Sequence, residues 1–524
     1  MEKDNYEMNG QDYAETQFQL GLMYYTGDGK QQDYEKAFEW FEEAAEQGHA
    51  AAQYYIGDMY YYGEGVNEDY NKALNYYIES AKKENSNAQN MIGAMYYYGN
   101  GVETDYNKAF EWLSKAAEQG HHGAQCMIGD MYYYGDGFET DDEKAFEWYL
   151  KSAEQGNPEA QYMIGEIYCY QENYDEALAW YNFAADQEYD KAQHKLGLMY
   201  YNGQGVEQNY EIAMYWFTKA ADQGNSKSQT FIGNMYNFGY GVEIDHEKTF
   251  KWYNKAAELD DGDAQVMLGF MYYYGEFVNQ NFEKAFELYS SAAEKNVRNA
   301  NTYAGDMYYN GEGVEQNYDK ALKYYYEDVK NNNEKAIFAI GKMHYLGEGL
   351  EQDYEEAFDW FMKAANLGSE EAMSYLGEMY YYGDGVDTNY EEAYKWYYKA
   401  AQEGHTNSQY NLGWMYKNGE GVNMDYEQAF EWFSIAAEKG NVSSQFNLGI
   451  MYYYGEGLLQ NYEEAFEWFN LAAENGYVPA QLQTGLMYSS GEGVEPDDDK
   501  ALEWIALAAE NGNEDAISIL KDIE

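Results

Sequence analysis

Apolar residues recur at helical spacing along this chain, in blocks that glycine interrupts. Within residues 52–62, Tyr55, Ile56 and Met59 follow the i, i+3, i+4 spacing that places side chains on one face of a helix. Gly63 begins a Gly-x-Gly pair directly afterwards. Because glycine readily adopts the positive φ of a helix C-cap, we expect this first helix to end there.

A second amphipathic helix is predicted in each block. In the first block it should start near Asp33, because Asp is a favoured N-cap residue. Ala37, Phe38 and Phe41 share one face of this helix, glutamates occupy another, and Gly48 is expected to end it. A recurring Ala-Ala pair on the apolar face is small enough to let helices of adjacent blocks approach to ~8–10 Å.

The two-helix block repeats along the chain. Its first-helix glycine occurs fourteen times, and twelve of the thirteen intervals are 36 residues, while one is 32. These glycines are Gly21, Gly57, Gly93, Gly129, Gly165, Gly197, Gly233, Gly269, Gly305, Gly341, Gly377, Gly413, Gly449 and Gly485. We therefore interpret residues 14–513 as one array without a separate catalytic domain, after a polar segment 1–13 that we expect to be partly disordered. Residues 514–524 are predicted to form a C-terminal capping helix over the last repeat.

The repeated pattern carries a resemblance to a known family. It reads Ala-x-x-x-(Ile/Leu)-Gly-x-Met-Tyr-Tyr-x-Gly-x-Gly-Val-x-x-(Asp/Asn)-Tyr-x-x-Ala-x-x-Trp-x-x-x-Ala-Ala-x-x-Gly. This resembles the Sel-one-like repeat (SLR), a subclass of the tetratricopeptide-like superfamily. The resemblance implies an all-α, right-handed α-solenoid superhelix of about fourteen helix-turn-helix repeats. It also implies an adaptor or scaffold for protein complexes.

Two positions in the pattern allow competing interpretations. Eleven of the twelve tryptophans occupy one position of the second helix, where we expect them to pack between repeats rather than to form a ladder of ligand-binding rings. The short repeat near residues 165–196 lacks the Gly-x-Gly-Val turn. Its four missing residues predict either a local change of superhelix geometry or a tolerated loop deletion.

The amino-acid composition restricts the classes of partner that this chain is expected to bind. Lys and Arg number 32 and Asp and Glu 94, which gives a net charge of −62. This charge opposes binding to nucleic acid and to anionic membranes. The 45% of hydrophobic residues exclude an acidic disordered tail. No secretory signal or apolar run of ~18 residues is visible, so we expect a cytoplasmic protein, with a secreted chain whose signal has been removed as the alternative.

Candidate catalytic chemistry is sparse. The seven histidines form no His-x-x-x-His or His-Glu-x-x-His spacing, and His49, His121, His122 and His405 fall in the turns between repeats. Cys126 and Cys169 lie in different repeats and are expected to be buried or half-exposed thiols. One carboxylate in each Gly-x-Gly turn is too few for calcium, which takes six to eight oxygens. We therefore predict no enzyme activity, no cofactor and no metal site.

The first helix offers a candidate binding surface. The residue four positions after the glycine is usually tyrosine, and the residue one position after it is often acidic. By resemblance, first helices line the concave groove of the superhelix, where tyrosines would contact Lys and Arg and carboxylates would steer a basic partner. The alternative is that these tyrosines pack against the neighbouring repeat. The candidate partner-binding residues are Tyr61, Tyr97, Tyr133, Tyr201, Tyr273, Tyr309, Tyr381, Tyr453, Asp58, Asp130, Glu166, Asp306 and Glu378.

The leading functional hypothesis is a non-enzymatic scaffold whose groove binds proteins or peptides with basic segments. One alternative is a structural protein that self-assembles, although its like charges favour a monomer. Another is a glycan or cell-wall binding module, which requires export.

Overall fold

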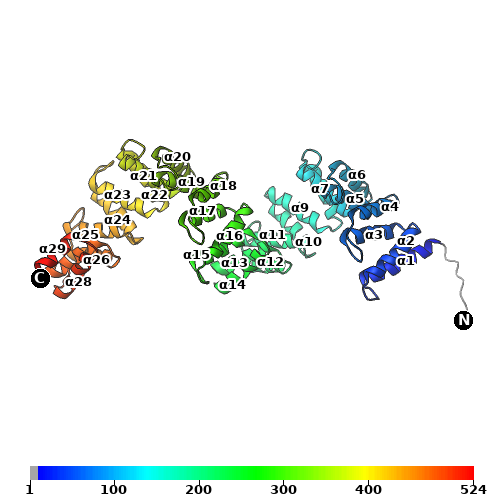
Figure 1. Cartoon of the computed structure of the whole chain (residues 1–524), viewed down its shortest axis with the longest axis horizontal. Helices are drawn as coiled ribbons and strands as arrows, with labels where there is room; N and C mark the ends of the chain where they lie inside the picture. The colour runs from blue at the N-terminus through cyan, green and yellow to red at the C-terminus, as the bar shows by residue number, and fades with distance from the viewer. Residues whose placement is uncertain (1–9, 524) are drawn as a thin grey trace. The chain divides into compact units, whose positions relative to one another are not determined.

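The chain is all-α over the residues that the computed structural model describes, 10–523. These residues form helices joined by short connections, without a strand in that range. They divide into two compact units, one ending at Ala264 and one beginning at Gln265. In each unit the helices follow one another as packed pairs, an odd-numbered first helix and an even-numbered second helix per repeat (Figure 1). This confirms the helical solenoid that the repeat pattern predicts.

The first unit contains seven repeats. Its helices are α1 (Gly10–Thr26), α2 (Tyr34–Glu46), α3 (Ala50–Tyr62), α4 (Tyr70–Ala81), α5 (Ser86–Tyr98), α6 (Tyr106–Glu118), α7 (His122–Tyr134), α8 (Asp142–Ala153), α9 (Pro158–Tyr170), α10 (Tyr174–Ala185), α11 (Asp190–Asn202), α12 (Tyr210–Asp222), α13 (Ser226–Phe238) and α14 (His246–Glu258).

The second unit contains the remaining repeats and the terminal helix. Its helices are α15 (Gly262–Tyr274, which starts at the end of the first unit), α16 (Phe282–Glu294), α17 (Ala300–Asn310), α18 (Tyr318–Val329), α19 (Glu334–Leu346), α20 (Tyr354–Asn366), α21 (Glu370–Tyr382), α22 (Tyr390–Glu403), α23 (Thr406–Asn418), α24 (Tyr426–Glu438), α25 (Val442–Tyr454), α26 (Tyr462–Glu474), α27 (Val478–Ser490), α28 (Asp498–Glu510) and α29 (Glu514–Ile523).

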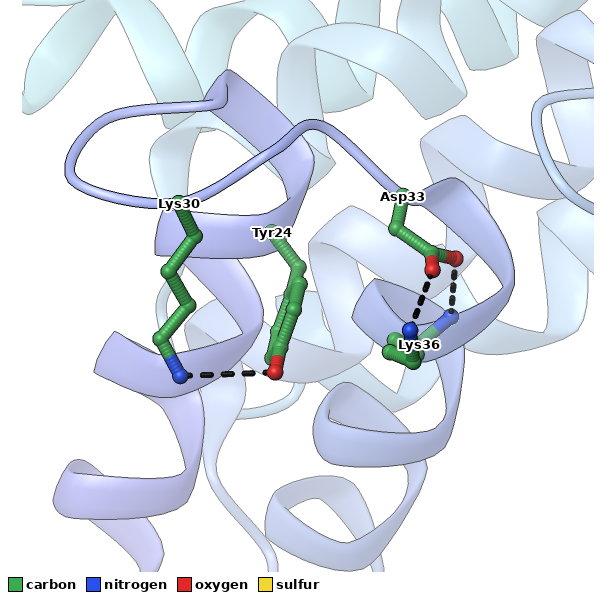
Figure 2. A network of polar contacts seen from close by, with 4 residues as sticks. All are labelled: Tyr24, Lys30, Asp33 and Lys36. Atoms are coloured by element: carbon green, nitrogen blue, oxygen red, sulfur yellow. Dashed lines mark hydrogen bonds and ion pairs between the residues drawn. The ribbon is translucent and has the colours of Figure 1, made fainter.

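Side-chain caps fix where the helices begin. Asp33 accepts a hydrogen bond from the backbone N–H of Lys36, and its carboxylate forms an ion pair with the Nζ of Lys36 at 2.7 Å (Figure 2). This satisfies one backbone donor that the first turn of a helix leaves unpaired. The first helix of the next repeat, α3, ends at Gly63, which adopts φ 72° and donates its N–H to the carbonyl of Met59. Both predicted boundaries are confirmed.

The first-helix glycine leaves room for a side chain of the second helix to pack directly on the backbone. A Cβ placed on Gly57 would stand 2.5 Å from the Tyr77 ring, which is fully buried. The ring of the second helix therefore rests directly on the backbone of the first. The same contact recurs between Gly21 and Phe41 and between Gly129 and Tyr149. Close helix packing thus depends on the absence of a side chain at this position.

The tryptophans pack between repeats, as the sequence predicted. Trp112 lies against a core cluster that spans two repeats, with Tyr77 from the preceding repeat and Ile92 from its own, and Trp148 lies against the next such cluster. The outer face of Trp112 is covered by Lys115, whose Nζ stands 4.2 Å from the ring centroid. These repeats are therefore tied to their neighbours by one large aromatic side chain each.

The ends of the array are helical. Of the polar segment 1–13, which we expected to be partly disordered, residues 10–13 belong to α1, which begins at Gly10, and residues 1–9 lie outside the described residues. At the other end α29 forms the predicted terminal helix, with Ala516, Ile519 and Leu520 against Ile505 of α28. In the short repeat, α9 and α10 pack as a pair like other repeats, joined by residues 171–173 alone.

Candidate functional site on the first helices

The candidate tyrosines lie near the C-terminal ends of the first helices, where all of them are half-buried. Most contact the aromatic residue that begins the second helix of the same repeat. Tyr61 and Tyr70 meet edge to face with centroids 5.1 Å apart, and Tyr97 and Tyr106 do so at 5.5 Å. The contacts of Tyr201, Tyr273, Tyr309, Tyr381 and Tyr453 are equivalent. These rings therefore help to join the two helices of a repeat.

Their hydroxyls reach the next repeat. The Tyr97 hydroxyl donates to Asp136, the central residue of the following Gly-x-Gly turn, at 2.6 Å. Similar bonds join Tyr25 to Glu64, Tyr273 to Glu312, Tyr309 to Glu348, Tyr345 to Asp384, Tyr381 to Glu420 and Tyr453 to Glu492. Where lysine replaces tyrosine, Lys417 forms an ion pair with the matching Glu456 at 2.9 Å. We call this line of contacts, 39 residues apart in sequence, the seam.

The seam explains the carboxylates in the turns. Burial, together with the hydrogen bond to Asp136, raises the pKa of Tyr97, so the phenol stays protonated and donates. Tyr61 differs because its hydroxyl accepts from Asn100, and Tyr201 meets the ring of Tyr240. The alternative interpretation, in which the tyrosines contact the neighbouring repeat, therefore describes their hydroxyls, whereas most of the rings lie against the second helix of their own repeat.

The candidate carboxylates lie deeper than the sequence pattern indicates. Asp58 is 7% exposed and accepts from the buried Tyr77 hydroxyl at 2.7 Å. Tyr149 donates to Asp130 and Tyr325 to Asp306 in the same way, and Tyr181 donates to Glu166, which also pairs with Lys195. The structure places Glu378 beside the buried Tyr397, whose pKa its charge helps to raise.

Burial changes the titration of these acids. It raises the pKa of Asp58, Asp130 and Asp306 to about 6, although each tyrosine hydrogen bond acts in the opposite direction. The pKa of Glu378 is also raised by burial. Asp58, Asp130 and Asp306 thus already have a hydrogen-bond partner inside their own repeat.

A row of exposed side chains lies on the first helices one residue after the candidate tyrosines, and most of these side chains are aromatic. Tyr62 is 60% exposed, whereas Tyr61 is half-buried and meets it edge to face at 4.9 Å. Burial raises the pKa of Tyr98 and Tyr134, and the charge of Asp130 raises it further. We call the following residues the exposed row: Tyr62, Tyr98, Tyr134, Tyr170, Phe238, Tyr274, Leu346, Tyr382 and Tyr454. The sequence analysis missed it, although the same repeat alignment contains it.

A cavity opens on this face in the second unit. It measures about 310 Å³ and lies between α21 and α23, with Tyr397 of α22 at its base. Trp414 is 38% exposed at its edge. Its lining residues are Tyr381, Tyr382, Tyr397, Tyr410, Asn411, Trp414 and Met415. An aromatic cavity of this size is suited to one apolar or cationic side chain.

The remaining candidate residues have structural roles. His49, His121 and His405 cap first helices by accepting from a backbone N–H. His194 is buried against Ser228, and burial lowers its pKa to about 4. Cys126 is buried and Cys169 half-buried, as expected. Within the described residues, no cluster of His, Cys, Asp and Glu is arranged to hold a metal ion. None of the described helices is long and apolar enough to cross a membrane.

Comparison with known proteins bears on the repeat. The family model for the Sel1 repeat matches residues 14–49, 50–85, 86–121, 122–157, 158–189, 190–225, 226–261, 262–297, 299–327, 334–369, 370–405, 406–441, 442–477 and 478–513. No curated protein matches the chain.

Two solved structures are similar to this chain to different degrees. A protective antigen present in uropathogenic Escherichia coli strains, which displays an SLR fold, is 28% identical with a TM-score of 0.58, over 93% of this chain and 97% of the antigen. A Sel1 repeat protein from Oxalobacter formigenes is 30% identical over 59% of this chain and 91% of its own, with a TM-score of 0.47.

Proposed function

Because this chain belongs to the Sel1 repeat family, whose members are generally protein-interaction scaffolds, we propose that it is a non-enzymatic scaffold for proteins or peptides with basic segments. The partner would lie along the first helices of a unit. There the exposed row supplies ring faces for Lys and Arg, and the candidate tyrosines of the seam contribute the edges between them.

The observation that carries this proposal is the exposed row beside buried negative charge. Asp58 lies four residues before Tyr62 on α3, and Asp130 lies four residues before Tyr134 on α7, so each carboxylate is one helical turn from the ring. Burial raises the pKa of Tyr62, Tyr98 and Tyr134, and the charge of Asp58 or Asp130 raises it further. A cation that docks on such a ring meets both its π face and a carboxylate close by. The carboxylates act through this field rather than by direct contact, because tyrosine hydroxyls already occupy them.

The test compares two sets of tyrosines that are exposed on different helices. Tyr62, Tyr98 and Tyr134 are changed to Ala in one variant, and the control changes Tyr215, Tyr326 and Tyr398, which are exposed on second helices. Binding of long Arg/Lys-rich and neutral peptides is measured at low and high salt. We expect the first variant to bind the basic peptide about tenfold more weakly, the control to match the unmodified chain, and salt to weaken binding. Equal binding of basic and neutral peptides would remove the electrostatic part of the proposal.

A further inference from the structure

The short repeat leaves a cavity in the first unit. It measures about 890 Å³ and is bordered by the start of α8 and the end of α9. Phe146 and Tyr168 form its apolar wall, with their rings edge to face at 5.6 Å. Tyr170 stands at its margin with 90% of its surface exposed. No turn covers this region, because residues 171–173 connect α9 directly to α10.

Other repeats fill the equivalent space with the Gly-x-Gly turn of the repeat that follows. Gly65 lies against Tyr34, Gly101 against Tyr70 and Gly137 against Tyr106, each so closely that an added Cβ would come within 2.8 Å of the tyrosine. The backbone of the turn therefore packs on the residue that begins the preceding second helix. At the cavity this residue is Asp142, where those three repeats have tyrosine.

Tyr133 loses both of its usual contacts here. In the repeat before it, Tyr97 meets the ring of Tyr106 and donates to Asp136 of the next turn. Tyr133 faces Asp142 in place of a ring, and the short repeat has no Gly-x-Gly turn to supply the acceptor. Tyr133 is half-buried and lines the cavity, and its hydroxyl makes no hydrogen bond within the described residues.

Three carboxylates give the cavity its charge. Asp142, Glu143 and Glu147 line it and are exposed, and none of them takes part in an ion pair within the described chain. The nearby Lys144 is engaged with Asp141 at 2.8 Å and lies over the Tyr132 ring. A cation entering the cavity would therefore meet uncompensated negative charge beside an aromatic wall.

We propose that this cavity binds a segment of a partner protein that carries Arg or Lys next to glycine, in the place of the missing turn. The small residue lets the segment's backbone approach the start of α8 at Asp142, as the glycines of the turns approach the tyrosine at the equivalent position elsewhere. The Tyr133 hydroxyl donates to a carbonyl of the segment, and the cationic side chain pairs with Asp142, Glu143 and Glu147. The inference rests on the proposed scaffold function but not on the exposed row.

The first test uses matched charge changes in the full chain. Glu143→Gln with Glu147→Gln alters the cavity, and Glu463→Gln with Glu467→Gln makes the same change at the same positions of a repeat whose turn is present, since Gly493 lies on Tyr462. Immobilised peptides containing Gly-Arg-Gly-Arg-Gly or the neutral Gly-Gln-Gly-Gln-Gly are compared by interferometry. We expect the cavity variant to weaken binding of the arginine peptide at least about fivefold and the control less than about twofold.

The second test restores the turn. Residues 171–173 are replaced by Gly-Gln-Gly-Val-Glu-Gln-Asn, the connection found at 203–209, together with Asp142→Tyr. We expect the inserted turn to fill the cavity and abolish binding of the arginine peptide, while circular dichroism shows unchanged helix content.

The outcomes separate this inference from the proposed function. The Tyr62, Tyr98 and Tyr134 variant should retain the short arginine peptide if the cavity is the site. Equal losses in the two glutamine variants, undiminished binding after restoring the turn, or no binding by the unmodified chain would each overturn the inference. None of these results bears on whether long basic peptides bind the exposed row.

Discussion

In several repeats the residue after the first-helix glycine is chemically matched to the ring that lies on this glycine, although Phe270 beside Tyr289 is an exception. Asp58 accompanies Tyr77 and Asp130 accompanies Tyr149, whereas Leu22 accompanies Phe41. In one further repeat Asn234 takes the acidic position and accepts from the Tyr253 hydroxyl at 2.6 Å. A hydroxyl is thus commonly present where an acceptor can satisfy it, which identifies these carboxylates as structural partners.

The buried acid should make stability depend on pH. Asp58 has an unfolded pKa of 3.8 and a folded pKa of about 6, so the folded state binds the proton more tightly between these values. Stability should therefore fall as pH rises through this window. Asp58→Asn keeps the acceptor without the charge, and we expect it to stabilise the first unit by ~1–3 kcal/mol at pH 7 and by little near pH 4.

Urea unfolding at both pH values measures this difference. Glu35→Gln, an exposed acid on α2, serves as the control, because it removes one charge without relieving burial. An equal gain from both substitutions, or a gain for Asp58→Asn that is larger at pH 4, would contradict the assignment.

At the scale of the helix pair, stability depends on how closely the ring of one helix meets the backbone of the other. Gly57→Ala would place a Cβ 2.5 Å from the Tyr77 ring, so we expect a loss of ~1–3 kcal/mol from overpacking. In a Tyr77→Ala background the same change should cost much less, since the ring that clashes is gone. Unfolding of the four chains gives the coupling energy, and simple additivity of the two costs would contradict direct contact.

The helix pair is also the part of the fold that the sequence predicted best. Gly63 and Asp33 mark their helix ends by local backbone chemistry, so both were readable from neighbouring residues. The orientation of Tyr61 and Tyr62 was not, because adjacent residues on a helix differ by about 100° and both positions recur as tyrosine. What separates them is the turn of the next repeat, to which the seam tyrosines bond 39 residues away. The cavity at the short repeat was likewise visible only as a missing turn.

At the scale of the whole molecule, electrostatic repulsion opposes folding. The net charge is −62, and most ion pairs in the described chain join residues three positions apart on a surface helix, as in Lys36 with Asp33. Such local pairs contribute ~0.2–1 kcal/mol each and do little to offset long-range repulsion between like charges. The chain therefore has more to gain from screening than a protein of balanced charge.

Salt should consequently stabilise the fold. Raising NaCl from low to moderate concentration screens the excess negative charge, and each kcal/mol recovered corresponds to roughly 1–2 °C in melting temperature for units of this size. Differential scanning calorimetry across a salt series measures this, with sucrose at matched osmolality as the uncharged control. A melting temperature that falls over this range would contradict the prediction.

The seam gives the repeats a common connector, since a tyrosine in one repeat and a turn carboxylate in the next recur in both units. Repeats that share a connector can be duplicated, lost or exchanged as whole blocks without altering their joints. They also offer a ligand many near-identical binding positions, so the ligand can bind in several registers. The connection at 171–173 interrupts this uniformity. The first unit therefore contains one position that differs from the other repeats, and a partner that binds there is held in a single register.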